Sequence, residues 1–199
     1  MTKNLQKILK GAVAVAAAAL AIGVSAQGVQ APAGLQWQQM HSIWFNTTVF
    51  SSTGTPEEKE LLGKIWAKEI SGSMKNQNGS LFPSSALIGN IEQNGIKIIF
   101  TMYNRAGSDC MQPGNGQGMV DMYATCPLRV IRLSGNDKPI VVDLPVNFCM
   151  LDVDDEHNPR SKNHNEYALD ARAGVIYLRT IQYGKVVPAC NRALQVFKV

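Results

Sequence analysis

Side chains that can bind a metal ion or move a proton gather near residue 155. Asp152, Asp154 and His157 are close in the sequence, and His164 follows soon after them. Carboxylates at alternate positions are typical of calcium loops, and imidazoles are common ligands of transition metals. These four residues are therefore candidate metal ligands. A metal-dependent hydrolase that uses them is one hypothesis for this chain.

The acidic segment does not fit the calcium loop of an EF-hand. If Asp152 held the first position, His157 would hold the sixth, where that loop needs glycine, and Asn163 would hold the twelfth, where it needs glutamate. The alternative interpretation is a solvated acidic loop between two strands, partly neutralised by Arg160 and Lys162.

The remaining histidine and the glycine-rich stretch do not complete a known catalytic motif. His41 lies between Trp37 and Trp44, where a hydrogen-bonded core histidine is favoured over a general base. The chain contains no G-x-S-x-G, no H-E-x-x-H and no phosphate-binding G-x-x-x-x-G-K-[ST]. The run PGNGQG over residues 113–118 is interpreted as a loop. We expect no cofactor.

Four cysteines lie in the second half of the chain: Cys110, Cys126, Cys149 and Cys190. An even number of cysteines in an exported chain predicts two disulfides. Three pairings are possible. We favour Cys110–Cys126 with Cys149–Cys190, because the first pair would close the glycine-rich loop between its members. The absence of a C-x-x-C spacing argues against a thiol nucleophile or a zinc site.

Residues 1–26 are typical of a secretory signal peptide. Three lysines precede an apolar stretch over residues 11–24, which ends in the small residues that signal peptidase requires, Val24-Ser25-Ala26. We expect cleavage before Gln27 and export through a Sec-type pathway to the periplasm or beyond. The apolar stretch is shorter than the roughly 20 residues of a spanning helix, so stable membrane insertion is not expected.

Charge and composition narrow the remaining possibilities. The 199-residue chain has a formal charge of +4. Most of that charge comes from the leader, and the other basic residues are scattered. Nucleic-acid binding, which needs a basic stripe, is therefore not expected. Residues 27–34 are interpreted as a flexible lead-in. The chain length and its 45% of hydrophobic residues predict a single domain over residues 35–199.

Two helices are predicted at the start of this domain. Residues 35–45 place three aromatic residues, a methionine and a histidine at the spacing of one amphipathic helical face. A second helix is predicted from Thr55, which with Pro56 and Glu58 has the pattern of a capping box, and it ends at Gly72.

The rest of the domain favours strands. Asn94-Gly95 and residues 134–137 predict hairpins, Asp170 to Gly174 predicts a tight turn, and further strands are expected over residues 120–126, 175–183 and 193–199. The fold class is therefore α+β, with one or two N-terminal helices packed on a mainly antiparallel sheet that carries two disulfides. Residues 73–86, 105–117 and 152–167 are predicted as loops.

The leading functional hypothesis is an exported, non-enzymatic domain that binds a macromolecular partner, either another protein or a cell-envelope component. Accessory, inhibitory, immunity and adhesion modules all belong to this class. Long loops on a rigid sheet often carry recognition, which draws attention to residues 105–117 and 152–167. A third hypothesis is a small-molecule carrier whose apolar cavity is lined by Trp37, Trp44, Trp66 and tyrosine residues, although the tryptophans are more simply explained as core.

Overall fold

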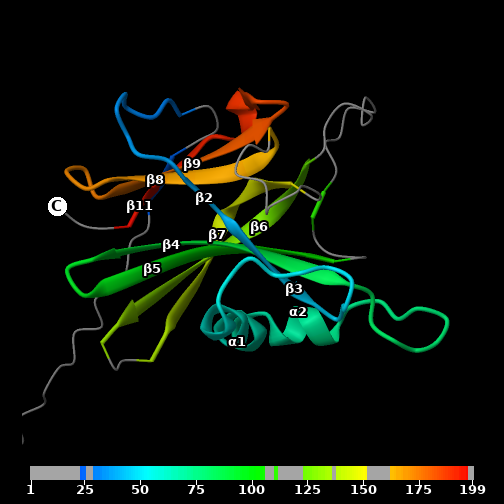
Figure 1. Ribbon diagram of the computed structural model, residues 1–199. Coiled ribbons are helices and arrows are strands. Elements are labelled where there is room, and N and C mark those ends of the chain that lie inside the picture. Colours follow the sequence, from blue (N-terminus) through cyan, green and yellow to red (C-terminus); the bar gives the residue numbers. More distant parts are fainter. Residues whose placement is uncertain are drawn as a thin grey trace, which may run out of the picture.

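The computed structural model describes residues 23–25, 29–105, 110–111, 123–135, 138–151 and 162–196. Two antiparallel sheets are stacked face to face, and two short helices cover the outer face of one of them (Figure 1). Strands make up 53% of the described residues and helices 13%. The predicted antiparallel sheet is confirmed, but α+β describes the fold only loosely because strands so outnumber helices.

The two sheets differ in their strand order. Sheet A runs in the order β1 (Gly23–Ser25), β11 (Arg192–Gln195), β9 (Val175–Gln182), β8 (His164–Asp170) and β2 (Gln38–Gln39), and β10 (Lys185–Val186) also pairs with β9. Sheet B runs in the order β3 (His41–Phe45), β4 (Ser84–Gln93), β5 (Ile96–Arg105), β6 (Tyr123–Ser134) and β7 (Ile140–Leu151). The helices are α1 (Pro56–Ile65), α2 (Ala67–Ser71) and the 3₁₀ helix η1 (Pro188–Cys190).

Sheet B separates two hydrophobic cores. Because successive side chains of a strand point to opposite faces, β5 contributes to both cores. Phe100 and Met102 are buried in the core between the two sheets, whereas Ile99 and Tyr103 are buried in the core beneath the helices. Burial on both faces explains why residues 98–103 of this strand are apolar except for Thr101.

Helix α1 begins where its local sequence predicts. The Thr55 hydroxyl accepts a hydrogen bond from Glu58 N at 3.2 Å, and Glu58 Oε2 accepts one from Thr55 N at 2.9 Å. The capping box is therefore confirmed. The other Glu58 oxygen accepts from Asn90 Nδ2 at 3.0 Å, which ties the start of the helix to β4. The helical region is divided at Trp66, where α1 ends and α2 begins.

The helix predicted over residues 35–45 is wrong. These residues form β2 and β3, two pieces of one extended segment that leaves sheet A and enters sheet B (Figure 1). Between them Met40 is buried, and its N–H donates to Asn165 O at 2.8 Å. The segment therefore passes from sheet A to sheet B at Met40.

The apolar residues of this segment share a helical spacing but not an environment. Met40 is buried between the sheets, and Phe45 is buried beneath the helices. Trp44 stacks on Phe50 with ring centroids 4.4 Å apart. Trp37 lies against Arg179 of β9. Because the segment contacts different layers before and after Met40, its apolar and polar residues do not alternate strictly.

Turns with local signals form as predicted, but several strand limits differ. Asn94 and Gly95 both have positive φ, 53° and 72°, in the hairpin between β4 and β5. The Asp170 carboxylate accepts from the N–H groups of Arg172 and Ala173 in the turn between β8 and β9. The predicted loops over residues 73–86 and 152–167 are both too long at their ends, because β4 starts at Ser84 and β8 at His164.

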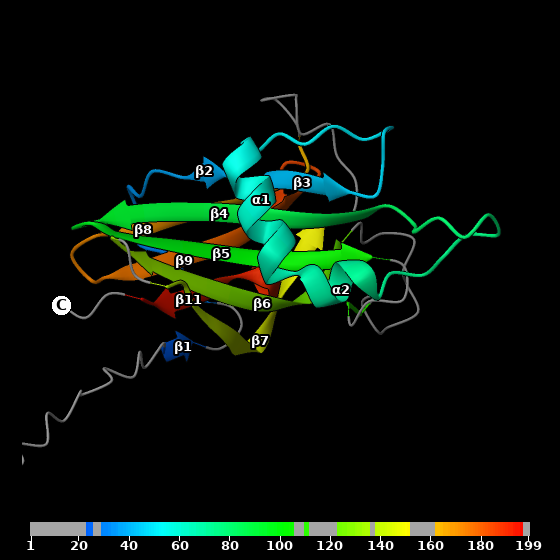
Figure 2. The ribbon, with the colours of Figure 1, turned by 90° about the horizontal axis from the view of Figure 1, so that it is seen from below.

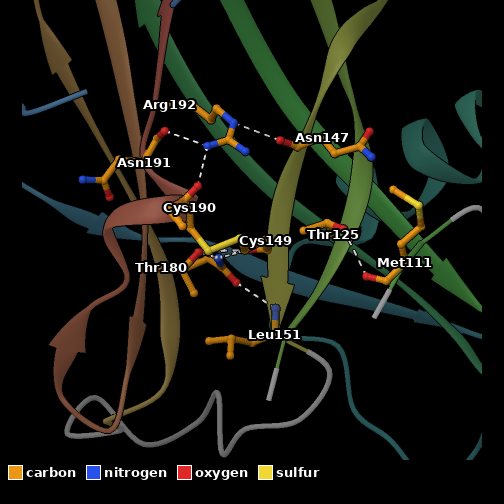
Figure 3. Close-up of a disulfide and its surroundings, with 11 residues drawn as sticks. Met111, Thr125, Asn147, Cys149, Leu151, Thr180, Cys190, Asn191 and Arg192 are labelled. Carbon is orange, nitrogen blue, oxygen red and sulfur yellow. Dashed lines mark hydrogen bonds between the residues drawn. A yellow bond between two sulfur atoms is a disulfide. The ribbon is translucent and has the colours of Figure 1, made fainter. Parts of the chain in front are cut away.

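Both favoured disulfide pairings are confirmed. Cys110 is bonded to Cys126 of β6, and Cys149 is bonded to Cys190. The second bond joins the two sheets, because Cys149 lies on β7 of sheet B and Cys190 lies in η1, just before β11 of sheet A (Figure 3). The sheets are thus cross-linked covalently as well as packed.

A buried amide reinforces the junction of the two sheets. Asn165 of β8 donates from Nδ2 to Cys149 O at 2.6 Å and to Thr180 Oγ1 at 2.9 Å, and its Oδ1 accepts from Leu151 N at 3.2 Å. The Thr180 hydroxyl also donates to Cys149 O at 3.1 Å. Polar groups buried at this depth cost stability unless they are paired, and these bonds pair them.

Arg192 of β11 extends the junction along β7 (Figure 3). Its Nε donates to Asn147 O at 2.9 Å, and its Nη1 donates to Ala189 O and Asn191 O, both at 2.8 Å. Burial lowers the pKa of this guanidinium. The three carbonyl contacts stabilise the charge where solvent is scarce.

A close approach at Gly89 provides a test of the packing between the sheets. A Cβ at this position would lie 2.2 Å from the Phe100 ring. We expect Gly89→Ala to lower the free energy of unfolding by about 1–3 kcal/mol, because the ring is fully buried and cannot move away. Gly63→Ala, in helix α1 with its nearest neighbour 3.8 Å away, should raise it by about 0.5–1 kcal/mol. Denaturant unfolding measures both, and two changes of the same sign would contradict the packing described.

Removal of each disulfide should have a different effect on stability and on amide hydrogen exchange in β11. Loop lengths of 16 and 41 residues predict losses of about 3 and about 4 kcal/mol for Cys110→Ser/Cys126→Ser and Cys149→Ser/Cys190→Ser. Only the second pair should also speed amide hydrogen exchange in β11, because only that bond holds the strand to the other sheet. Equal exchange in the two double variants would show that Cys149–Cys190 does not restrain β11.

Candidate functional site

The structure places only one of the four candidate metal ligands. Asp152, Asp154 and His157 lie outside the described residues. His164, predicted to lie in the same loop, is instead the first residue of β8. Within the described ranges no three His, Cys, Asp or Glu side chains converge in a way that would hold a metal ion.

His164 belongs to a row of polar side chains on the outer face of sheet A. Its Nε2 lies 2.8 Å from Glu166 Oε1, and Glu166 Oε2 accepts from Arg179 Nε at 2.6 Å. Asn165, between the two β8 residues, points inward to the sheet junction, so alternation turns His164 and Glu166 outward. The carboxylate therefore links an imidazole on its own strand to a guanidinium on the next.

Arg179 connects this row to the segment that precedes β2. Its guanidinium carbon lies 3.7 Å from the centroid of the Trp37 ring. A guanidinium over an indole face is a favourable cation–π contact. At the next residue, Gln38 Oε1 accepts from the Tyr167 hydroxyl at 2.8 Å, and burial raises the pKa of Tyr167. The start of β2 and the residue before it are thus fixed to β8 and β9.

The same segment forms one wall of a groove of about 700 Å³ on the outer face of sheet A. Residues 29–34 line one side, and Tyr177, Arg179 and Asn191 are among the residues that line the other. This volume lies within the range of about 300–1,000 Å³ typical of ligand sites. The groove offers aromatic surface, a cation and an amide in one place.

Asn191 lines the groove and carries an unpaired polar atom. Its Oδ1 is buried and has no hydrogen-bond partner among the described residues. Its backbone carbonyl accepts from Arg192, and its N–H donates to Pro188 O at 3.1 Å, so its main chain is held in place. Buried polar atoms are nearly always paired, so this atom, like Ser84 Oγ and Gln93 Oε1, is an exception among the described residues.

His41 does not have the role predicted for it. It is exposed at the start of β3, so the interpretation as a hydrogen-bonded core histidine is wrong. The predicted helix, whose apolar face suggested that His41 is buried, does not form, because these residues are extended in β2 and β3.

A second cluster of charged and aromatic side chains lies beneath the helices and has a structural explanation. Arg129 of β6 stacks on Trp66 at 4.0 Å and pairs with Glu69 at 3.2 Å and with Asp143. Its Nη1 also donates to Ile65 O at 2.8 Å. These contacts attach α1 and α2 to sheet B.

The sequence contained part of the signal for the groove. In residues 175–182, Ile176 and Leu178 alternate with Tyr177 and Arg179, which predicts that the latter pair faces outward. The packing of Trp37 on Arg179 could not be derived in this way. It depends on a strand pairing between residues far apart in the chain, Gln38 and Tyr167.

Comparisons with family models, with curated proteins and with solved structures found no match to this chain.

Removing the Arg179 side chain tests whether its contact with Trp37 holds the groove wall formed by residues 29–34 in place. We expect Arg179→Ala to speed amide hydrogen exchange over residues 29–38 and to lower the free energy of unfolding by about 1 kcal/mol, since it removes a cation–π contact and a partly exposed ion pair. Arg172→Ala, on the exposed turn after β8, is the matched control and should change neither. Unchanged exchange in Arg179→Ala would mean that the wall is held by other contacts.

Proposed function

We propose that this chain is exported and that its mature part binds a macromolecular partner, a protein or another component of the cell envelope, without catalysing a reaction on it. Two observations support the export: the leader-like residues 1–26 and the two disulfides, which are compatible with an oxidising compartment. Within the described residues no helix has the length and apolarity to cross a membrane.

The groove beside β9 is the observation that supports binding most directly. It combines the exposed parts of Trp37 and Tyr177, on which an apolar group can lie, with the buried Asn191 Oδ1, which needs a donor. Aromatic surface with a few placed polar groups is the usual composition of a recognition site. We assign the groove to a partner segment that presents a hydrogen-bond donor beside an apolar group.

The loops remain part of this proposal. Of residues 105–117 and 152–167, the structure describes residues 105, 110–111 and 162–167. Residues 162 and 163 lie at the base of the second loop, where Lys162 O accepts from Gly184 N at 2.7 Å and Asn163 Oδ1 accepts from Tyr183 N at 2.6 Å. The end of this loop, just before β8, is therefore held by hydrogen bonds to the turn between β9 and β10.

A carrier cavity shared by the three tryptophans is not found among the described residues. Trp66 is buried beneath the helices, Trp44 stacks on Phe50, and Trp37 lies on the outer face of sheet A. The third hypothesis is therefore wrong in its choice of residues, since the two sheets separate them.

The binding proposal predicts a specific loss on altering the groove. Asn191→Leu removes the unpaired acceptor and Tyr177→Ala removes aromatic surface. We expect each to weaken the affinity for a partner, captured from envelope extract and identified, by about tenfold. Tyr183→Ala is the control because Tyr183 is exposed on the β9–β10 turn and is not among the residues that line the groove. Deletion of residues 112–117 and of residues 153–160 in separate variants tests the loops.

Two outcomes would contradict this function. If no groove variant and no loop deletion changes the affinity, the partner does not use these surfaces. If protein purified from the exported fraction carries about one equivalent of a metal that His157→Ala and His164→Ala release, the metal-dependent hydrolase becomes the better interpretation.

A further inference from the structure

A strand at the edge of a sheet presents backbone N–H and C=O groups that invite pairing with another chain. The edge of sheet B at β3 is closed by the chain itself. Ser42 N donates to Thr53 Oγ1 at 3.1 Å, Trp44 N donates to Ser52 Oγ at 2.9 Å, and Ser42 O accepts from Thr53 N at 2.9 Å. The segment after β3 folds back and satisfies the outer groups of this strand.

The second half of the edge at β7 is closed in a different way. Pro145 interrupts the strand and has no N–H to donate. Asn147 O accepts from Arg192, Cys149 O accepts from Asn165, and Leu151 N donates to Asn165 Oδ1. The outer edge of sheet A at β2 is only two residues long, which is itself a protection against pairing.

The edge of sheet A at β11 is closed by β1 (Figure 2). The two strands are antiparallel, with Gly23 opposite Gln195, Val24 opposite Leu194 and Ser25 opposite Ala193. All of β1 lies within the leader that we expect to be removed before Gln27. Cleavage would therefore take away the strand that covers this edge.

We propose that removal of the leader opens the edge of β11 and that the mature protein uses it to accept an extended segment of its protein partner as an added antiparallel strand. This inference rests on the proposed function, because it requires export, cleavage and a macromolecular partner. It adds a second contact surface on sheet A and specifies the chemistry of that contact, which is main-chain pairing.

The orientation of β11 supports this role. Val196 N donates to Gly174 O, so the backbone groups of alternate residues, Leu194 and Arg192, point to β9. Those of Ala193 and Gln195 consequently point to β1. Pairing with β1 already shows that a strand fits at this edge in register.

The side chains of β11 leave the edge uncharged and rigid. Arg192, its only charged residue, points inward and donates to Asn147 O. Leu194 is fully buried in the core between the sheets, and Ala193 is small. The Cys149–Cys190 bond fixes the chain just before the strand. A preorganised edge lowers the entropy cost of adding a strand, and an uncharged partner of small and β-branched residues, like Gly23-Val24-Ser25, fits it.

The test compares two forms of the protein and one probe. The first form begins at Gln27, and the second begins at Leu20 and so retains β1. The probe is a synthetic peptide of residues 20–26 with added terminal lysines for solubility. In the first form we expect saturating peptide to slow amide exchange of Ala193 and Gln195 by about tenfold or more. The second form should already show slow exchange and should not respond to the peptide.

Two controls isolate the main-chain contact. The same peptide with Ser25→Pro lacks the backbone N–H of the residue opposite Ala193, whose backbone groups point to this edge, so it should give no protection. The exchange of Ile99, in the middle of sheet B, should be unaffected in every mixture, which shows that the fold is unchanged.

Three results would overturn the proposal. Equal exchange at β11 in both forms without peptide would show that β1 does not cover the edge. Equal protection by the Ser25→Pro peptide would show binding that is not strand addition. A dimer of the form beginning at Gln27, with β11 protected at its interface, would assign the edge to a second copy.

The identified partner separates this inference from the proposed function. If the form beginning at Leu20 binds that partner as tightly as the form beginning at Gln27, the edge is not the docking site, but the binding function stands. If neither form binds a partner while the peptide still protects β11, the edge property holds and the proposed function fails.

Discussion

The arrangement of the two sheets depends on how Cys149 is held. Its sulfur is bonded to Cys190 of the opposite sheet, and its carbonyl oxygen accepts hydrogen bonds from Asn165 and Thr180. One residue of β7 therefore contacts η1, β8 and β9 at once. Because a buried carbonyl and a buried amide are both costly when unpaired, the sheets have one favourable relative position near this point, and hydrophobic packing alone would define it less sharply.

This junction also determines what the molecule presents to solvent. Asn165 must face inward to reach Cys149, and alternation along β8 then turns His164 and Glu166 outward. The same reasoning applies to β9, where Thr180 faces the junction and Arg179 faces solvent. The row that holds Trp37, and with it one wall of the groove, is thus a consequence of the polar contacts on the opposite face of the same strands.

Features with a local cause were predictable from the sequence, and features with a distant cause were not. The capping box of α1 and the Asn94-Gly95 turn depend on residues a few positions apart, and both form as predicted. The helix prediction for residues 35–45 was wrong because this segment contacts two sheets and a helix layer. Its apolar residues therefore have a spacing that resembles a helical period. The groove depends on Gln38 pairing with Tyr167, and no local pattern records that register.

The strand edges show the same distinction between local and distant causes, and they bear on how the chain avoids association with itself. Hydroxyl groups close β3, and a proline with inward hydrogen bonds closes β7, whereas β11 has neither device and depends on residues 23–25. An uncovered edge promotes self-association while a chain is folding. In the proposed mature form, which lacks residues 23–25, the edge of β11 is uncovered while Cys149–Cys190 restrains the strand. The asymmetry among the edges is therefore consistent with an edge whose pairing partner comes from outside the chain.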